Sequence, residues 1–174
     1  DPGRDVLIQR VTFEGLNGKK AKDFNLYVLH NPSMDNSGAN DTSKTLVSGG
    51  RTMLVASQNS RASAVAISRP WKLSGTTPMV SSGFVGVNDG YTDLAADKTM
   101  NNTFDSAVNG NVAQLGWVDL GTSTTATSIS FDMVLGFGTT EANAMNAATG
   151  TLGANMATIE TTYNTEWNTY ANAL

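Results

Sequence analysis

The chain has 174 residues, with 15 acidic and 11 basic side chains and a formal net charge of −4. Binding through nucleic-acid phosphates needs a basic face, so this balance argues against nucleic acid as a partner. There is no cysteine, which excludes disulfides, thiolate metal sites and cysteine nucleophiles. No apolar run approaches the ~20 residues of a membrane span.

The first segments have the pattern of β-strands. Residues 6–13 alternate, with Leu7, Val11 and Phe13 on one face. The dipeptide Asn17-Gly18 indicates a tight turn. A second strand follows and stops before a proline, which cannot donate to a ladder; one of its faces is formed by Phe24, Leu26 and Val28.

The middle of the chain predicts further strands. Residues 52–57 and 62–68 are separated by four polar residues and form an expected hairpin. Residues 71–103 have the composition of loops. A strand is expected over 111–120, and the clearest period-2 alternation of the chain lies at 127–135.

The period changes after residue 138. Thr139 or Thr140 can cap a helix, Glu141 suits its first turn, and Gly150 can end it. A second helix is expected from about Ala154 to Ala173, about six turns long. Its apolar stripe recurs at helical spacing and is formed by Leu152, Met156, Ile159, Tyr163, Trp167, Tyr170 and Leu174. The sequence therefore predicts an all-β antiparallel sandwich over 1–138 and a helical segment over 139–174.

Two stretches carry a family resemblance. Residues 23–42 and 82–94 each join a strand to a loop rich in Asn, Asp, Gly and Ser. They resemble the N-terminal β-supersandwich module of bacterial glucoamylases and glucodextranases, the inverting glucosidases of glycoside hydrolase family 15. Further segments match the family in order along the chain; they are Val11–Gly18, Leu54–Ser57, Ala62–Ser68, Gly110–Val112, Leu135–Gly138 and Glu141.

The resemblance implies a part of a longer, secreted or periplasmic enzyme. The chain would be roughly the C-terminal two thirds of the family's module, a β-supersandwich fragment. The (α/α)₆ catalytic domain would begin after Leu174. The expected partners are that domain and N-terminal strands of the same polypeptide, or another copy of the chain. The expected role is structural docking on the catalytic domain and its stabilisation, and the alternatives are a carbohydrate-binding module for α-glucans and an enzyme in its own right.

The residues give no catalytic set. An inverting glycosidase needs an acid and a base carboxyl about 6.5–9.5 Å apart. None of the four glutamates reads as half of such a pair. His30 is the only histidine and has no partner cluster. No metal site or cofactor is expected, although calcium is an alternative for the aspartates in loops, which are Asp35, Asp41, Asp89, Asp93 and Asp97.

Aromatic residues are the remaining candidates. Trp71 follows a proline in a loop and is the aromatic residue most expected to be exposed, whereas Trp117 lies within a strand and is expected in the core. The candidates for a carbohydrate or a domain interface are Trp71, Asp89, Tyr91 and Asp93. The second helix should fold only while docked on the sandwich or on the catalytic domain, through Met156, Ile159, Tyr163, Trp167 and Tyr170.

Overall fold

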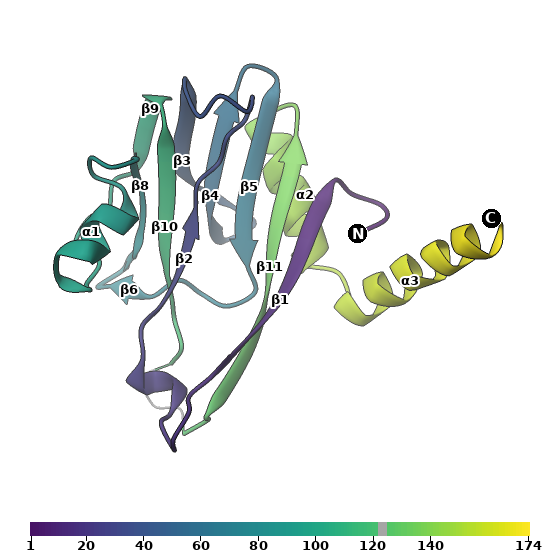
Figure 1. Ribbon diagram of the computed structural model, residues 1–174, viewed down its shortest axis with the longest axis horizontal. Helices are drawn as coiled ribbons and strands as arrows, with labels where there is room; N and C mark the ends of the chain where they lie inside the picture. Colours follow the sequence, from purple (N-terminus) through teal and green to yellow (C-terminus); the bar gives the residue numbers. More distant parts are fainter. Residues whose placement is uncertain (122–124) are drawn as a thin grey trace.

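Two antiparallel sheets form a sandwich (Figure 1) in the computed structural model, which describes residues 1–121 and 125–174. The larger sheet has six strands in the order β1-β11-β5-β4-β3-β9. Their bounds are Val6–Glu14 for β1, Ser128–Gly138 for β11, Arg61–Ile67 for β5, Arg51–Gln58 for β4, Asp41–Ser48 for β3 and Ser106–Gly110 for β9. Every pairing in it is antiparallel.

The smaller sheet has three strands, in the order β2-β10-β8. They span Leu26–His30, Val112–Val118 and Val80–Phe84. The short strands β6 (Leu73–Ser74) and β7 (Thr77–Pro78) pair with each other, and a single 3₁₀ turn, η1, spans Ala21–Asp23. This is the all-β antiparallel sandwich that the alternation of apolar residues predicts.

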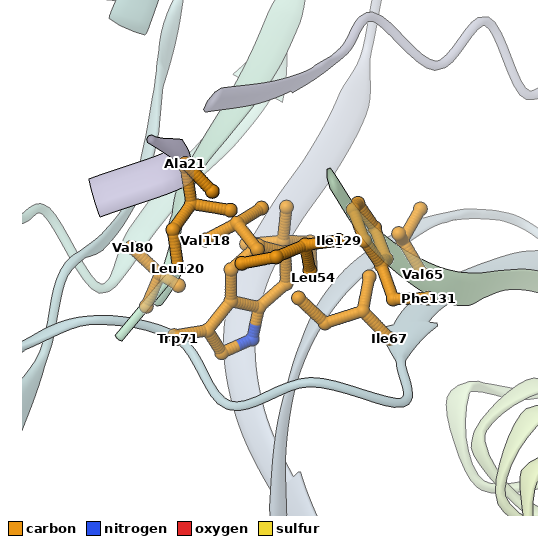
Figure 2. Close-up of a cluster of buried hydrophobic side chains, with 10 residues drawn as sticks. All are labelled: Ala21, Leu54, Val65, Ile67, Trp71, Val80, Val118, Leu120, Ile129 and Phe131. Atoms are coloured by element: carbon orange, nitrogen blue, oxygen red, sulfur yellow. The ribbon is translucent and has the colours of Figure 1, made fainter. Parts of the chain in front are cut away.

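The main core lies between the two sheets (Figure 2). Alternate residues of the larger sheet face it, because successive side chains of a strand point to opposite faces. Its buried members are Ala21, Leu54, Val65, Ile67, Trp71, Val80, Val118, Leu120, Ile129 and Phe131.

Helix α2 (Glu141–Leu152) covers the opposite face of the larger sheet, over β11, β5 and β4. Its axis lies very close to the sheet because small residues meet there. Ala144 and Ala148 are fully buried, and a Cβ placed on Gly136 would stand 2.4 Å from the carbonyl oxygen of Ala144. Thr140 caps the helix, as predicted, by accepting a bond from the Asn143 amide. The predicted end at Gly150 is wrong, since the helix continues by two residues.

The two remaining helices differ in how they are held. Helix α1 (Gly90–Asp97) lies beside the smaller sheet, and Gly90 allows its first turn to approach Leu115. Helix α3 (Met156–Asn172) projects from the body of the sandwich, and none of its residues is buried (Figure 1). The predicted pair of C-terminal helices is therefore confirmed, but α3 does not lie flat on the sandwich.

A small hydrogen-bonded network of polar groups lies in the interior between the sheets. Gln114 is fully buried and donates from Nε2 to the carbonyl oxygen of Val55 at 3.0 Å. This bond turns the Oε1 of Gln114 towards His30, whose Nδ1 lies 3.0 Å away and donates to it. Burial lowers the pKa of His30, and the bond to Gln114 opposes that effect only in part. His30 is thus a satisfied strand-end residue held in its neutral form.

Candidate interaction surface

Two of the glutamates make defined contacts. Glu141 accepts from the Nζ of Lys44 and from the Oγ of Ser57, each at 2.8 Å. Burial alone would raise the pKa of Glu141, but these two bonds and the charge of Lys44 lower it, so the group is ionised near neutral pH. Glu160 lies on α3 beside Arg10. Glu141 is therefore not the protonated acid that glycoside cleavage requires.

The exposure expected of Trp71, as a candidate for a carbohydrate or a domain interface, does not fit the structure. The side chain is only 5% exposed and lies in the main core, where Figure 2 shows its indole among aliphatic side chains. Its Nε1 donates to the carbonyl oxygen of Thr52 at 2.8 Å. The loop position misled the prediction because the segment pairs with Val118 in an isolated bridge and turns inward.

The prediction for Trp117 is wrong in the opposite direction, because this residue was expected in the core. It is only half-buried, on the outer face of the smaller sheet. The Nζ of Lys72 lies 3.8 Å from its ring centroid, and the ring of Tyr27 packs beside it at 5.2 Å between centroids. Alternation alone could not assign this residue, because its strand has apolar residues on both faces. A sugar that stacked on this ring would therefore have to displace Lys72 from the face that it covers.

The stretch around residue 90 is a helix start, which the loop composition concealed. Asp89 is the N-cap of α1 and accepts bonds from the amides of Tyr91 and Thr92. Burial raises the pKa of Asp89, but these bonds and one from the Gly86 amide outweigh it and lower the pKa. Asp93 is buried and accepts from the amides of Asn101 and Asn102. Only Tyr91, which is 72% exposed, is available to a ligand.

The loop aspartates have turn-forming roles rather than a shared centre. Asp35 accepts from the amide and hydroxyl of Ser37, and Asp97 accepts from the Thr99 amide. Asp41 is fully buried beside the Met34 amide. Within residues 1–121 and 125–174, no group of three or more His, Asp or Glu side chains is placed to hold a metal ion. The geometry gives the calcium alternative no support.

Helix α3 carries large apolar side chains that are exposed. Asn155 caps it, accepting from the amides of Ala157 and Thr158. Its first turns approach β1. There Met156 packs against a second, smaller core, which lies between α2 and the larger sheet and includes Met53, Val134, Ala144 and Ala148. Between helix and strand lies an open groove of about 460 Å³. Its lining is mainly apolar and includes Val6, Leu7, Ile8, Met156, Ile159 and Tyr163.

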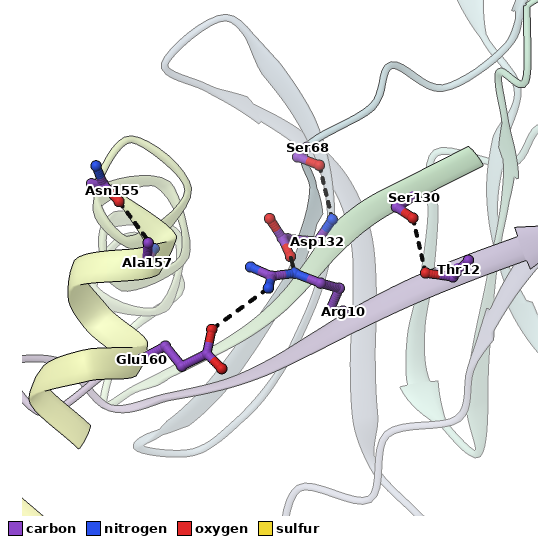
Figure 3. Close-up of polar contacts among 8 residues, drawn as sticks. All are labelled: Arg10, Thr12, Ser68, Ser130, Asp132, Asn155, Ala157 and Glu160. Carbon is purple, nitrogen blue, oxygen red and sulfur yellow. Dashed lines mark hydrogen bonds and ion pairs between the residues drawn. The ribbon is translucent and has the colours of Figure 1, made fainter. Parts of the chain in front are cut away.

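Few contacts hold α3 in place. The guanidinium of Arg10 lies 3.1 Å from Asp132 and 3.6 Å from Glu160. Figure 3 shows it between the two carboxylates. The side chains of Arg10 and Glu160 are 56% and 63% exposed, so this ion pair contributes less than about 1 kcal/mol. Beyond Ile159 every residue of the helix is exposed. The helix is therefore attached at its first turns alone.

The C-terminal part of the predicted docking stripe is exposed to solvent. Tyr163, Trp167 and Tyr170 are 50%, 54% and 58% exposed. Their rings pack edge to face, with centroids 6.2 Å and 5.9 Å apart. The three aromatic rings form one continuous row, called here the aromatic row of α3. The sandwich itself, one of the two docking surfaces that the stripe predicted, does not cover this row.

The opposite face of α3 is rich in threonine. Thr161, Thr165 and Thr169 each donate a hydroxyl bond of 2.8 Å to the carbonyl oxygen four residues earlier. These bonds satisfy the hydroxyls within the helix, although such residues have weak helix propensity. The threonine hydroxyls on the polar face thus have their hydrogen-bond partners within the helix. The aromatic row on the other face has no partner from outside the helix among the described residues.

Fold and surface together define a β-sandwich module that carries a projecting aromatic helix. The sequence profile of the family described as glucodextranase, domain N, matches residues 1–172. The chain belongs to this family, and the predicted resemblance to the N-terminal module of bacterial glucoamylases and glucodextranases is confirmed. No helix in the described part of the chain has the length and apolar character needed to cross a membrane.

Two relatives of the chain are much longer than it is. It is 31% identical over all 174 residues to a glucoamylase of Clostridium sp. (strain G0005), of which it covers 23%. A crystal structure of a bacterial glucoamylase complexed with acarbose superposes with a TM-score of 0.85 at 30% identity. That match covers 97% of this chain and 23% of the solved one. The chain thus spans about a quarter of the length of these relatives.

Proposed function

We propose that this chain is a non-catalytic structural domain of a longer, secreted or periplasmic glucoamylase-like hydrolase of α-glucans. Its work is to dock on the catalytic part of that protein and to stabilise it. The observation that carries the proposal is the aromatic row of α3, a stripe of rings at helical spacing that no described residue covers.

The energetics favour burial of this row against another protein surface. Folded monomers seldom leave large contiguous apolar patches in water. The rings of Tyr163, Trp167 and Tyr170 are already ordered against one another, so docking costs little side-chain entropy. The three side chains retain half or more of their surface for a partner. A helix attached only by its first turns can also adjust its angle to that partner.

The two alternative functions lack comparable support. A carbohydrate-binding module needs exposed aromatic platforms. Trp71 is buried, Lys72 lies over the ring of Trp117, and Tyr91 stands alone. The exposed rings of α3 pack edge to face with one another, so they form no flat platform for a sugar. An independent glycosidase needs a facing carboxyl pair, whereas Glu141 is ionised and bonded to Lys44. Both alternatives can be tested by experiment.

The first experiment measures chemistry and binding by the chain alone. Incubation of residues 1–174 with maltooligosaccharides, isomaltose and dextran should release no glucose above buffer. Calorimetric titration with maltoheptaose should show no tight binding. Glucose release that Glu141→Gln abolishes would establish an enzyme instead, and tight binding that Tyr91→Ala removes would establish a binding module.

The second experiment tests the structural role directly. In a longer polypeptide that contains this domain and a catalytic part, removal of residues 1–174 should lower the melting temperature of the catalytic part and shorten its half-life on heating. The turnover number of the molecules that remain folded should change little, because the domain supplies no reacting group. An unchanged melting temperature would contradict the proposal.

A further inference from the structure

Strands β4 and β5 separate at one end of the larger sheet. Their pairing with each other stops at Leu54 and Val65, although both strands extend further. On their outer sides they stay paired, β4 with β3 as far as Arg51 and β5 with β11 as far as Ile67. At this separation lies an open pocket of about 280 Å³, which is lined by residues 50–52 and 67–71 and by the hairpin of β6 and β7.

Hydrogen bonds hold the walls of this pocket in place. The Nε1 of Trp71 donates to the carbonyl oxygen of Thr52, which lies in the unpaired part of β4. The carbonyl oxygen of Pro70 accepts from the amide of Asp119 at 3.0 Å. Trp71 and Ile67 belong to the main core (Figure 2). The pocket is therefore built on buried residues and is not a gap between mobile side chains.

Two arginines line the pocket, and both are half-buried. The Nη1 of Arg51 donates to the carbonyl oxygen of Ile67 at 3.3 Å. The Nε of Arg69 donates to the carbonyl oxygen of Asp119 at 2.8 Å. A guanidinium has five N–H donors, so each of these bonds orients the group and leaves other donors for a further acceptor.

Neither arginine has a counter-charge. Among the described residues, no carboxylate lies within ion-pair distance of Arg51 or Arg69. The carboxylate of Asp119 accepts from a backbone amide of its own loop. Beside the pocket, Ser68 bonds the amide of Asp132, whose carboxylate is turned to Arg10 (Figure 3). A chain with a net charge of −4 thus has a pocket with two cations and no anion.

We propose that this pocket binds a small organic molecule that carries a carboxylate or phosphate group. The guanidiniums of Arg51 and Arg69 donate to the oxyanion, since their planar forks match both groups. The apolar part of the ligand lies against Pro70, Leu73 and Pro78, which also line the pocket. The volume is below the range of about 300–1,000 Å³ that is usual for drug-sized ligands, so the ligand is small.

The inference is independent of the proposed structural role, because it needs no catalytic part and no contact of α3. Half-buried arginines that merely bond carbonyl groups and water are the other explanation of the same geometry. The two explanations differ in one measurable respect. Only a ligand site should saturate with an oxyanion and fail to respond to an equal concentration of chloride.

Calorimetric titration of residues 1–174 with sodium butyrate and with inorganic phosphate tests the site. Sodium chloride at equal ionic strength is the reference, because it supplies the same screening. At least one of the two oxyanions should saturate in about the millimolar range, which is what so small a ligand can reach. A response to both that does not saturate, or that chloride reproduces, would overturn the inference.

Substitutions assign the binding to the two arginines. Arg51→Gln and Arg69→Gln should each weaken it at least about tenfold, through loss of a charge-assisted hydrogen bond. Arg61→Gln, at an exposed position on the turn between β4 and β5, is the matched control and should change it less than about twofold. Thermal melts check that each variant folds. Where one does not, the lysine variant replaces it and should bind at least about threefold more weakly, because lysine lacks the planar fork. Equal affinity of all variants would refute the site.

Nuclear magnetic resonance locates the ligand. The indole N–H signal of Trp71 should shift along the same saturation curve, because this side chain lines the pocket. That of Trp167, on α3, is the internal control and should not move. A saturable shift at Trp167 without one at Trp71 would place the ligand elsewhere and contradict the inference. In a longer polypeptide that contains this domain, the same probes should still bind. Loss of binding there would mean that an acidic side chain of that polypeptide fills the pocket, and would overturn the small-molecule ligand without affecting the docking role.

Discussion

Replacement of Trp167 by alanine tests the docking role of α3. In residues 1–174 the indole touches mainly Tyr163 and Tyr170 of its own helix. Such neighbouring pairs stabilise a helix by about 0.2–0.5 kcal/mol each. Alanine has a higher helix propensity than tryptophan, by up to about 0.7 kcal/mol, which offsets this loss. The free energy of unfolding of the isolated chain should therefore change by less than about 0.5 kcal/mol.

The expected effect is larger where a partner covers the row. Trp167 leaves 54% of its surface in water. With roughly 230 Å² for the whole side chain, a partner that covers it removes roughly 120 Å² from water, which contributes about 3 kcal/mol at about 25 cal/mol per Å². The same substitution in the longer polypeptide should thus be several-fold more destabilising than in the isolated domain.

Urea titrations of both proteins measure the two values. Thr165→Ala is the matched control, because Thr165 lies on the opposite face of α3 and bonds only within the helix. It should leave the longer polypeptide within about 0.5 kcal/mol of the unsubstituted protein. If Trp167→Ala changes the longer protein no more than Thr165→Ala does, the aromatic row is not an interface and the docking argument is wrong.

Three further substitutions test the interior. Gly116→Ala should destabilise the chain by about 1–3 kcal/mol in urea melts, because its Cβ would stand 2.4 Å from the ring of Trp71. Asp89→Ala should cost about 1–2 kcal/mol through loss of the N-cap of α1, and Asp89→Asn should cost less, as circular dichroism melts at neutral pH can show. His30 has a folded-state pKa below its unfolded value of about 6.5. Stability should therefore be full above that value and fall as the pH drops through the folded pKa, and melts of His30→Gln should lack this step.

The strands could be predicted where one face of a strand is polar and the other apolar. In the strand at 128–138, polar and apolar residues alternate from Ser128 to Met133, and the prediction placed the strand within a few residues. Strand β3, by contrast, was missed, because Asp41 and Ser43 are fully buried polar residues and interrupt the apolar pattern. Helix α1 was missed for a similar reason, since its sequence, Gly-Tyr-Thr-Asp-Leu-Ala-Ala-Asp, opens with a turn-forming glycine. Its formation depends on the cap at Asp89 and on the room that Gly90 leaves beside Leu115.

The candidate aromatic residues were harder to predict, because exposure is a tertiary property. Whether a tryptophan next to a proline lies inside depends on where the chain turns next, and Trp71 turns into the space that Gly116 leaves open. The apolar stripe of α3 could be predicted from spacing, but spacing does not identify the surface that covers it. Local sequence therefore predicts which residues are expected to be buried. Only the structure shows which of these residues remain exposed.

The two surfaces without a partner meet at β1. Leu7 lines the groove beneath α3 and also lies on the face of β1 that Val11 and Phe13 turn towards the main core. On this inner face Leu7 is 51% exposed, and Phe137 of β11 is 43% exposed. Among the described residues β1 is an outer strand of the larger sheet, so its unpaired edge separates the two surfaces. Substitutions at Trp167 and Phe137 probe opposite sides of this boundary. Their effects should add in the longer polypeptide if separate segments cover them, because distant independent sites are additive within about 0.3–0.5 kcal/mol. A clear departure from additivity would mean that one body of the protein covers both sides of β1, and that the domain is held to the rest of its polypeptide through a single continuous interface.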